Sequence, residues 1–325
     1  MSKRYLVTGG TGFIGAAAVR RLVRDGHTVR VLDDNSRGHP RRVADIAGHF
    51  EMIAGDVRDE AAVARAANSC DAVLHLAAVN GTEFFYSKPE LVLDVGVRGM
   101  LSVIAACRAN GIGDLVVASS SEVYQTPPRV PTAEDAPMSI PDPTNPRYSY
   151  AGSKVLTELI AINYGRTGFA RVAVFRPHNV YGVDMGWEHV IPQFAVRAKR
   201  LADANPRGAL RFPLQGAGAQ MRAFNHIDDF TDGLMTVLHK GAHLSIYHIG
   251  TPEETAMADL ARCVAARLGR EIEIEPGPEP KGGTQRRCPD ISRLAALGYA
   301  PRIKLADGIG PVVDWYAANA AQAPN

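Results

Sequence analysis

A glycine-rich loop between an apolar segment and a helical segment is the feature that most limits the possible folds of this chain. Residues 5–8 (Tyr-Leu-Val-Thr) have the composition of a buried strand, and residues 12–24 have the spacing of a helix. The connecting loop is Gly9-Gly10-Thr11-Gly12-Phe13-Ile14-Gly15. Gly9 permits a tight turn, Gly12 lets a pyrophosphate approach the backbone, and Gly15 allows close packing of helix on strand. The sequence therefore predicts a dinucleotide-binding α/β fold.

An acidic residue follows the second predicted strand. Asp33 comes directly after residues 28–32, about 20 residues beyond the glycine loop. A carboxylate at this place accepts hydrogen bonds from the adenosine ribose and repels a 2′-phosphate, which favours NAD over NADP. Arg30 and Arg37 lie nearby in the sequence, so NADP stays open as the alternative.

Short apolar segments alternate with helical segments through the first half of the chain. Strands are predicted at 5–8, 28–32, 50–53, 72–76, 114–118 and 171–175, and helices at 12–24, about 89–110 and about 148–167. This order predicts a doubly wound parallel sheet of the Rossmann type. The pattern becomes irregular after Arg176, which predicts a smaller C-terminal α/β substrate-binding domain. We expect residues 1–176, with 224–250 returning to them, to form the cofactor domain. Residues 177–223 and 251–325 then form the substrate domain, with 275–283 as a loop.

Composition excludes several classes of protein. The chain of 325 residues has 36 Lys plus Arg against 34 Asp plus Glu, a net charge of +2, so we expect neither nucleic-acid nor membrane binding.

The N-terminus does not match a signal peptide, and the four cysteines are far apart, which predicts reduced thiols in a cytoplasmic protein. The histidines have no metal-ligand spacing, so no metal is expected. Arg41 and Arg42 are predicted to be solvated surface charges.

A tyrosine and a lysine stand four residues apart on one face of a predicted helix. Tyr150 and Lys154 alone also fit a surface tyrosine beside a solvated lysine. Their place after the fifth strand favours catalysis, because ligands of open α/β sheets bind at the carboxyl ends of strands. A nearby cation lowers the pKa of a tyrosine, which then takes a hydroxyl proton while a hydride leaves the carbon. Ser120, at the end of the fifth strand, is placed to bond the same substrate oxygen.

Together these motifs resemble those of the extended short-chain dehydrogenase/reductases that act on nucleotide sugars. The resemblance runs nearly from end to end. Besides the glycine loop and the Tyr150–Lys154 pair, it is carried by Asp33-Asp34-Asn35-Ser36, Gly55-Asp56-Val57, His75-Leu76-Ala77-Ala78, Ser119-Ser120-Ser121-Glu122-Val123-Tyr124, Arg176-Pro177-His178-Asn179-Val180-Tyr181-Gly182, Gly216-Ala217-Gly218-Ala219-Gln220-Met221-Arg222 and Arg286-Arg287-Cys288-Pro289-Asp290-Ile291.

The resemblance implies roles for individual residues. NAD contacts are expected from Gly9, Gly12, Phe13, Ile14, Gly15, Asp33, Asp56, Val57, Leu76, Ala77, Ala78, Tyr150, Lys154, Pro177 and His178. The catalytic group is Ser120, Tyr150 and Lys154 with Glu122, and contacts with a nucleotide-diphosphate sugar are expected from Asn179, Arg222 and Arg287. The chain departs from the family pattern at Gly96, where asparagine is usual, at Gln125, where glycine is usual, and at Pro280-Lys281-Gly282, where an Arg-Pro-Gly element is degraded.

The resemblance also implies a reaction that begins with oxidation at C4 of the sugar. We expect a 4-epimerase, because Ser121 occupies the place of an acid that one group of dehydratases uses. The alternative is a 4,6-dehydratase or decarboxylase that uses Glu122. A non-catalytic cofactor-binding protein is a third hypothesis. The helix with Tyr150 has more apolar positions than one buried face needs, which predicts pairing with the helix of residues 91–106 in a homodimer.

Overall fold

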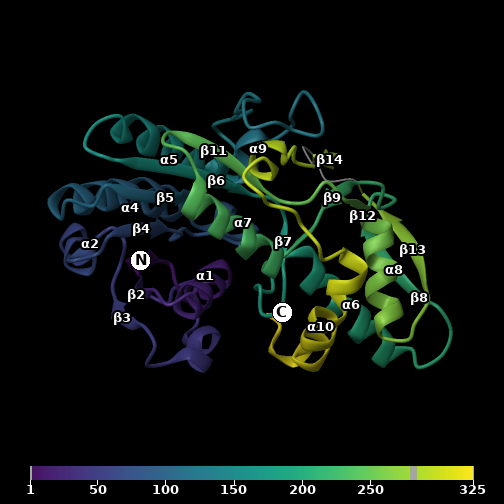
Figure 1. Ribbon diagram of the computed structural model, residues 1–325. Helices are drawn as coiled ribbons and strands as arrows, with labels where there is room; N and C mark the ends of the chain where they lie inside the picture. The colour runs from purple at the N-terminus through teal and green to yellow at the C-terminus, as the bar shows by residue number, and fades with distance from the viewer. Residues whose placement is uncertain (1, 279–283, 325) are drawn as a thin grey trace.

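A seven-stranded parallel sheet forms the larger part of the computed structural model, which describes residues 2–278 and 284–324 (Figure 1). Its order is β11-β6-β5-β4-β1-β2-β3. The strands are β1 (Arg4–Thr8), β2 (Thr28–Asp33), β3 (Glu51–Ala54), β4 (Ala72–His75), β5 (Asp114–Ala118), β6 (Arg171–Pro177) and β11 (Ser245–Ile249). The chain runs outward from β1 to β3, returns to β4 beside β1, and runs outward in the other direction. This reversal confirms the predicted doubly wound Rossmann sheet.

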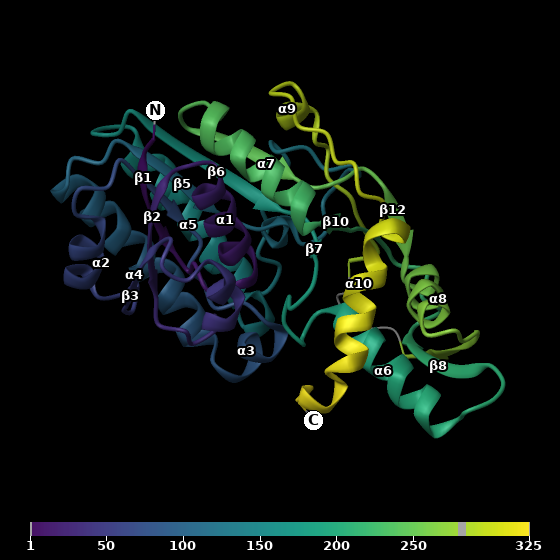
Figure 2. The ribbon, with the colours of Figure 1, turned by 60° about the horizontal axis from the view of Figure 1, so that its bottom comes forward.

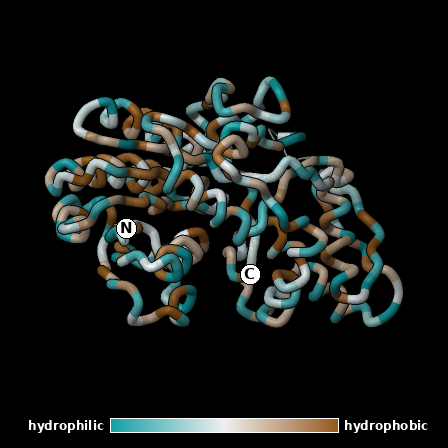
Figure 3. The backbone as a smooth tube through the Cα atoms, viewed as in Figure 1, coloured by the Kyte–Doolittle hydropathy of each residue, from teal (hydrophilic) through white to brown (hydrophobic). Residues whose placement is uncertain are grey.

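Helices cover both faces of this sheet, because its strands are apolar on both sides. Neighbouring residues such as Leu6 and Val7 point to opposite faces and belong to two separate buried clusters. One face is covered by α1 (Phe13–Arg24) and α7 (Ile227–Lys240), and the other by α2 (Glu60–Ala67), α4 (Pro89–Ala109) and α5 (Ser149–Gly165). The hydrophobic stretches of the chain accordingly follow the central strands and the helices against them (Figure 3).

A second, smaller part lies beside the sheet and has its own buried cluster (Figure 2). Its helices are α6 (Val190–Ala204), α8 (Met257–Arg267) and α10 (Leu305–Ala318). Strand β8 (Leu210–Gln215) pairs in parallel with β13 (Ile272–Gly277). The prediction of a loop from residue 275 is therefore wrong for residues 275–277. A proline is tolerated at position 276 because each strand of a two-stranded pair is an edge strand.

The remaining elements are short. They are β7 (Val180–Tyr181), β9 (Met221–Ala223), β10 (Asn225–His226), β12 (Glu254–Ala256), β14 (Arg286–Arg287), α3 (Thr82–Ser87), α9 (Ser292–Ala295), η1 (Pro40–Ile46), η2 (Ser121–Tyr124), η3 (Pro146–Tyr148) and η4 (Ala320–Gln322). Residues 291–299, which fall within the predicted substrate domain, contribute Leu294 and Tyr299 to the cluster beneath the sheet. In the described residues, no helix is long and apolar enough to cross a membrane.

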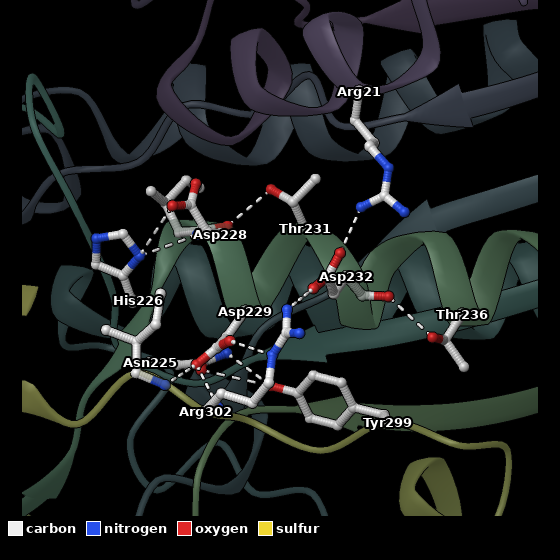
Figure 4. Close-up of polar contacts among 12 residues, drawn as sticks. Arg21, Asn225, His226, Asp228, Asp229, Thr231, Asp232, Thr236, Tyr299 and Arg302 are labelled. Carbon is white, nitrogen blue, oxygen red and sulfur yellow. Dashed lines mark hydrogen bonds and ion pairs between the residues drawn. The ribbon is translucent and has the colours of Figure 1, made fainter. Parts of the chain in front are cut away.

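A buried carboxylate on α7 joins the sheet to the segment that leads into α10 (Figure 4). Asp229 is 1% exposed, and its Oδ2 accepts hydrogen bonds from the backbone N–H groups of Arg302, at 2.8 Å, and Ile303, at 2.7 Å. Asp232, one turn later, accepts from Arg302 and also from Arg21 of α1. Helix α7 thus connects the segment that leads into α10 to α1, which covers the same face of the sheet.

We predict that Asp229→Ala lowers the free energy of unfolding by roughly 2–4 kcal/mol, because two buried N–H donors lose their acceptor. Urea denaturation followed by circular dichroism measures the change. Asp228→Ala on the same helix is the matched control, since that side chain is 78% exposed and should change stability by under about 1 kcal/mol. Equal losses in the two variants would contradict the role given to Asp229.

Candidate active site

The carboxyl ends of β1, β4, β5 and β6 open into one cavity of about 370 Å³. Most of the predicted site residues line it. They are Gly9, Gly12, Phe13, Ile14, Gly15, Leu76, Ala78, Ser120, Glu122, Tyr150, Lys154, Pro177, Asn179 and Arg287. An adjoining cavity holds Asp33, Asp56, Val57 and Ala77, and a third holds Arg222. The three cavities share lining residues, so they form one continuous groove from the glycine loop to the second part of the chain.

The glycine loop leaves room for a pyrophosphate at the start of α1. Gly9 has a φ of 75°, and a Cβ there would lie 2.8 Å from the backbone nitrogen of Ala77. A Cβ at Gly15 would lie 2.0 Å from the carbonyl oxygen of Gly9. Side chains at these positions would fill the space between loop, strand and helix, so the glycines fit the predicted cradle for NAD.

The carboxylate of Asp33 ties this loop to the end of β2. Its two oxygens accept hydrogen bonds from the backbone N–H groups of Thr11 and Asn35, each at 2.9 Å. A carboxylate has further lone pairs for two ribose hydroxyls. Of the two arginines considered for a 2′-phosphate, Arg30 is occupied by Glu51 and by backbone carbonyls, and only Arg37 lines the groove.

Ser120, Tyr150 and Lys154 meet above the end of β5. The hydroxyl of Ser120 lies close enough to Tyr150 to lower the pKa of its phenol, and the Nζ of Lys154 lies 5.8 Å from the centre of the Tyr150 ring. The same ammonium donates a hydrogen bond of 2.9 Å to the carbonyl of Ala118. The ring of Phe85, which the sequence did not single out, stacks on Tyr150 with centroids 5.1 Å apart. Stacking and the lysine contact fix the phenol at the rim of the cavity.

Within the protein, Tyr150 does not have the lowered pKa that the sequence predicted. Burial raises the pKa of Tyr150 above its ordinary value and outweighs the hydrogen bond with Ser120, which lowers it. Burial likewise lowers the pKa of Lys154 to about 8, although Glu158 opposes that effect. The prediction failed because it counted the cation and not the loss of water around both groups.

A buried ion pair beneath the site holds the catalytic loop. Arg176 on β6 and Glu158 on α5 are each 2% exposed and form two hydrogen bonds, of 2.8 and 2.6 Å. Glu158 also accepts from the hydroxyl of Ser119, and Arg176 donates to the hydroxyl of Tyr124 and to the carbonyl of Glu134, the last at 2.9 Å. Residues 119–124 are therefore fixed from below by groups on two other elements.

Four charged groups gather at the far end of the groove. Arg287 donates a hydrogen bond to the carboxylate of Glu122. Burial alone would raise the pKa of Glu122, but Arg287, with Arg147 and Arg222, lowers it below the ordinary value. Arg222 is held by the carbonyl of Thr284 at 2.7 Å, and Asn179 donates to the carbonyl of Ala223 at 3.1 Å. Glu122 is therefore an ionised carboxylate paired with a cation.

One predicted contact does not reach the groove. His178 is 1% exposed, and its ring packs edge-on against His248, with centroids 4.6 Å apart, rather than lining any of the three cavities. Its neighbour Pro177 does line the groove. The sequence showed that Pro177 and His178 lie at the end of a strand, but not which of the two side chains faces the groove and which is buried in the core.

Two departures from the family pattern have a structural reason. A Cβ at Gly96 of α4 would lie 2.8 Å from the Cβ of Ser153 on α5, so glycine permits the close approach of these helices. Gln125 has a φ of 52°, in the region that favours glycine, and its amide donates to the carbonyl of Glu122 at 2.7 Å. The degraded element at Pro280-Lys281-Gly282 lies outside the described residues.

Comparison with known proteins shows the family to which the chain belongs. The model of the NAD-dependent epimerase/dehydratase family matches residues 5–250, so the chain belongs to that family. UDP-glucuronic acid decarboxylase 1 of Danio rerio is 28% identical over 97% of the chain and 73% of that relative. UDP-glucose 4-epimerase of Mycolicibacterium smegmatis is 30% identical over 96% of the chain and 98% of the relative.

A solved structure is similar over nearly the whole chain. The dTDP-glucose 4,6-dehydratase of Streptomyces venezuelae, solved with NAD bound, has a TM-score of 0.85 and 31% identity, with 98% of each chain covered. The predicted family, Rossmann fold and NAD cofactor are confirmed. The three relatives carry three different activities at about the same identity, so the chain is assigned to a family of NAD-dependent enzymes acting on nucleotide sugars and the activity itself is taken up below.

We predict a pH dependence of stability from Lys154. Its pKa is about 8 in the folded protein and 10.5 ordinarily, so between these values the unfolded chain binds a proton that the folded chain lacks. Stability of the NAD-free protein, relative to Lys154→Met, should therefore rise by roughly 1–3 kcal/mol between pH 7 and pH 10. Urea unfolding at the two pH values measures this, and parallel curves for protein and variant would contradict it.

Proposed function

We propose that this protein is an NAD-dependent 4-epimerase of nucleotide-diphosphate sugars that acts through transient oxidation at C4. The observation that carries the proposal is the placement of Ser120, Tyr150 and Lys154 in the same cavity as the glycine loop. The arginines that line the third cavity, such as Arg222, are suited to bind the diphosphate.

In the first step, Ser120, Tyr150 and Lys154 have different roles. When bound, NAD supplies a hydride acceptor, later a hydride donor, and a positively charged ring. Tyr150 takes the proton of the C4 hydroxyl, and Ser120 hydrogen-bonds the same oxygen as it becomes a carbonyl. Burial raises the pKa of the phenol, and Lys154, whose Nζ lies 5.8 Å from the centre of the ring, would supply the positive charge that favours the phenolate once substrate and cofactor are bound. After the keto sugar has rotated to present its other face to the cofactor, Tyr150 returns the proton to the C4 oxygen, which completes the cycle.

Charge favours a neutral sugar in this groove. The charged residues that line the third cavity, called the sugar-side cavity below, are five arginines and three glutamates: Arg147, Arg197, Arg200, Arg222, Arg287, Glu83, Glu122 and Glu188. The diphosphate brings about two negative charges, and together with the three carboxylates these balance the five guanidinium groups. Epimerisation also requires no further acid or base. Glu122, ionised and paired with Arg287, is a weak base, and Ser121 offers no acid for the loss of water.

Decarboxylation of a nucleotide-diphosphate hexuronate is the second candidate. It is favoured by Arg287, which lines both the catalytic cavity and the sugar-side cavity. A guanidinium at that place is suited to a sugar carboxylate. Oxidation at C4 makes this group a β-keto acid, which loses carbon dioxide as the C5 bond electrons move into the C4 carbonyl. C5 then takes a proton before the hydride returns to C4.

The products formed from a panel of nucleotide sugars test the proposal. We expect a product of unchanged mass with inverted C4 by NMR, and a loss of about 10²–10⁴-fold in rate for Tyr150→Phe. In deuterated water the product should carry no deuterium at C5, because the C5–H bond is never broken. Glu122→Gln, which keeps the shape of the side chain, should reduce the rate only modestly.

Each competing activity gives a distinct result in the same experiment. Loss of carbon dioxide with deuterium at C5 indicates the decarboxylase, and loss of water with no product from Glu122→Gln indicates the dehydratase. Bound NAD with no sugar converted indicates the non-catalytic hypothesis. Any of the three would contradict the epimerase.

We also propose that the enzyme is a homodimer paired through α4 and α5. These adjacent helices expose large apolar side chains, each 37–47% exposed: Leu93, Leu101, Leu156, Leu159 and Tyr164. Contiguous apolar surface of this kind is typical of an interface.

Sedimentation velocity tests the dimer. We expect a dimer for the native chain and a monomer for Leu156→Glu/Leu159→Glu, because two buried charges would oppose pairing. Met52→Glu is the control, since Met52 is 39% exposed on β3 at the edge of the sheet and its charge should leave the dimer intact. A native monomer at all concentrations, or a dimer in the double variant, would contradict the interface.

A further inference from the structure

A segment of the second part lines the cofactor groove and is bound by arginines of the first part. Asp184, which follows β7, accepts hydrogen bonds from Arg41 Nε at 2.9 Å and from Arg41 Nη2 at 2.7 Å. Arg42 donates to the same carboxylate at 3.2 Å and to the carbonyl of Asp184 at 3.0 Å. The expectation of a solvated charge is therefore wrong for Arg42, whose side chain is 13% exposed, whereas Arg41 is paired but remains 43% exposed.

A second ion pair crosses the groove next to the first. Arg37, in the loop after β2, donates to Glu188 at 3.0 Å, and its guanidinium lies 4.4 Å from the centre of the Phe84 ring. Both partners are largely shielded, with side chains 29% and 24% exposed. Arg37 and Glu188 line the same cavity as Gly12 and the residues that follow it. The pair thus spans the groove where the dinucleotide is held.

Both sides of this crossing are anchored to packed elements. Trp187 lies between the two partners in sequence and packs against Trp315 and Tyr316 of α10, with ring centroids 5.8 and 5.0 Å apart. On the other side, Arg20 of α1 donates to the carbonyl of Arg42 and pairs with Asp45 at 2.8 Å. Because neither side is a free loop, the ion pairs connect two fixed bodies.

We propose that Arg37–Glu188 and Arg41/Arg42–Asp184 form an ionic clasp that closes the groove over NAD and slows its release. Asp184 and Glu188 are positioning residues in this proposal, since they act through the arginines. The advantage of retention rests on the proposed function, in which hydride returns to the sugar and NAD need not leave between turnovers. Partly buried ion pairs are screened by salt less than exposed ones but still respond to it.

The rate of NAD release from the purified holoenzyme tests the clasp without any sugar. Released NAD is trapped by excess alcohol dehydrogenase and ethanol, and the absorbance of NADH reports the rate. The variant is Asp184→Asn/Glu188→Gln, which removes two charges and keeps both shapes. Asparagine also tolerates the φ of 59° at position 184. We expect release to become about tenfold faster or more, with the rate less dependent on ionic strength than in the native enzyme.

Two controls separate the clasp from a general loss of structure. Asp203→Asn removes an exposed ion pair with Lys199 on α6 and should leave the release rate unchanged. Arg41→Gln combined with Asp184→Asn should be no faster than Asp184→Asn alone, because both changes break the same contact. If the double charge variant fails to fold, NAD release from the native enzyme at increasing salt concentration tests the proposal, because the clasp requires that this rate rise with salt. An unchanged rate in a folded variant, or a salt-independent native rate, would overturn the proposal.

Discussion

The buried pair of Arg176 and Glu158 is the interaction on which the active site depends. It joins the end of β6 to α5 at a depth where an unpaired charge is not tolerated, and removal of one partner from such a pair typically costs about 3–5 kcal/mol. Glu158 lies one turn beyond Lys154 on α5, and it also binds Ser119 at the end of β5. One ion pair therefore sets the relative position of the helix with Tyr150 and Lys154 and the strand end with Ser120.

The sequence predicted those parts of the structure that depend on local pattern. The glycine loop and the spacing of Tyr150 and Lys154 each lie within a short segment and were placed correctly. The six predicted strands also form, but helix α2 between β3 and β4 was not predicted. The pairing of β8 with β13 was missed although both strands alternate between more and less buried residues. Each strand contains a proline, which in a sequence pattern indicates a loop.

Interactions between distant segments were beyond the reach of the sequence pattern. Glu122 and Arg287 were each expected at the site, but their pairing brings together residues 165 positions apart. Arg41 and Arg42 looked like surface charges because Asp184, their partner, is more than 140 positions away. The pKa of Tyr150 was mispredicted for a related reason: burial is a property of the whole fold, whereas the neighbouring lysine is visible in the sequence.

An ion pair lies at each end of the groove, and each pair joins residues from distant segments of the chain. At the end far from the glycine loop, Arg287 pairs with Glu122, which keeps a carboxylate ionised in the cavity that also holds Ser120 and Tyr150. At the cofactor end, Glu188 from the second part meets Arg37 from the loop after β2. Each contact joins the larger and the smaller part of the chain across the groove. Under the proposed function, in which a hydride is removed and then returned, the keto sugar and the cofactor would have to stay together in one enclosed space, and an ion pair spans the groove at each of its ends.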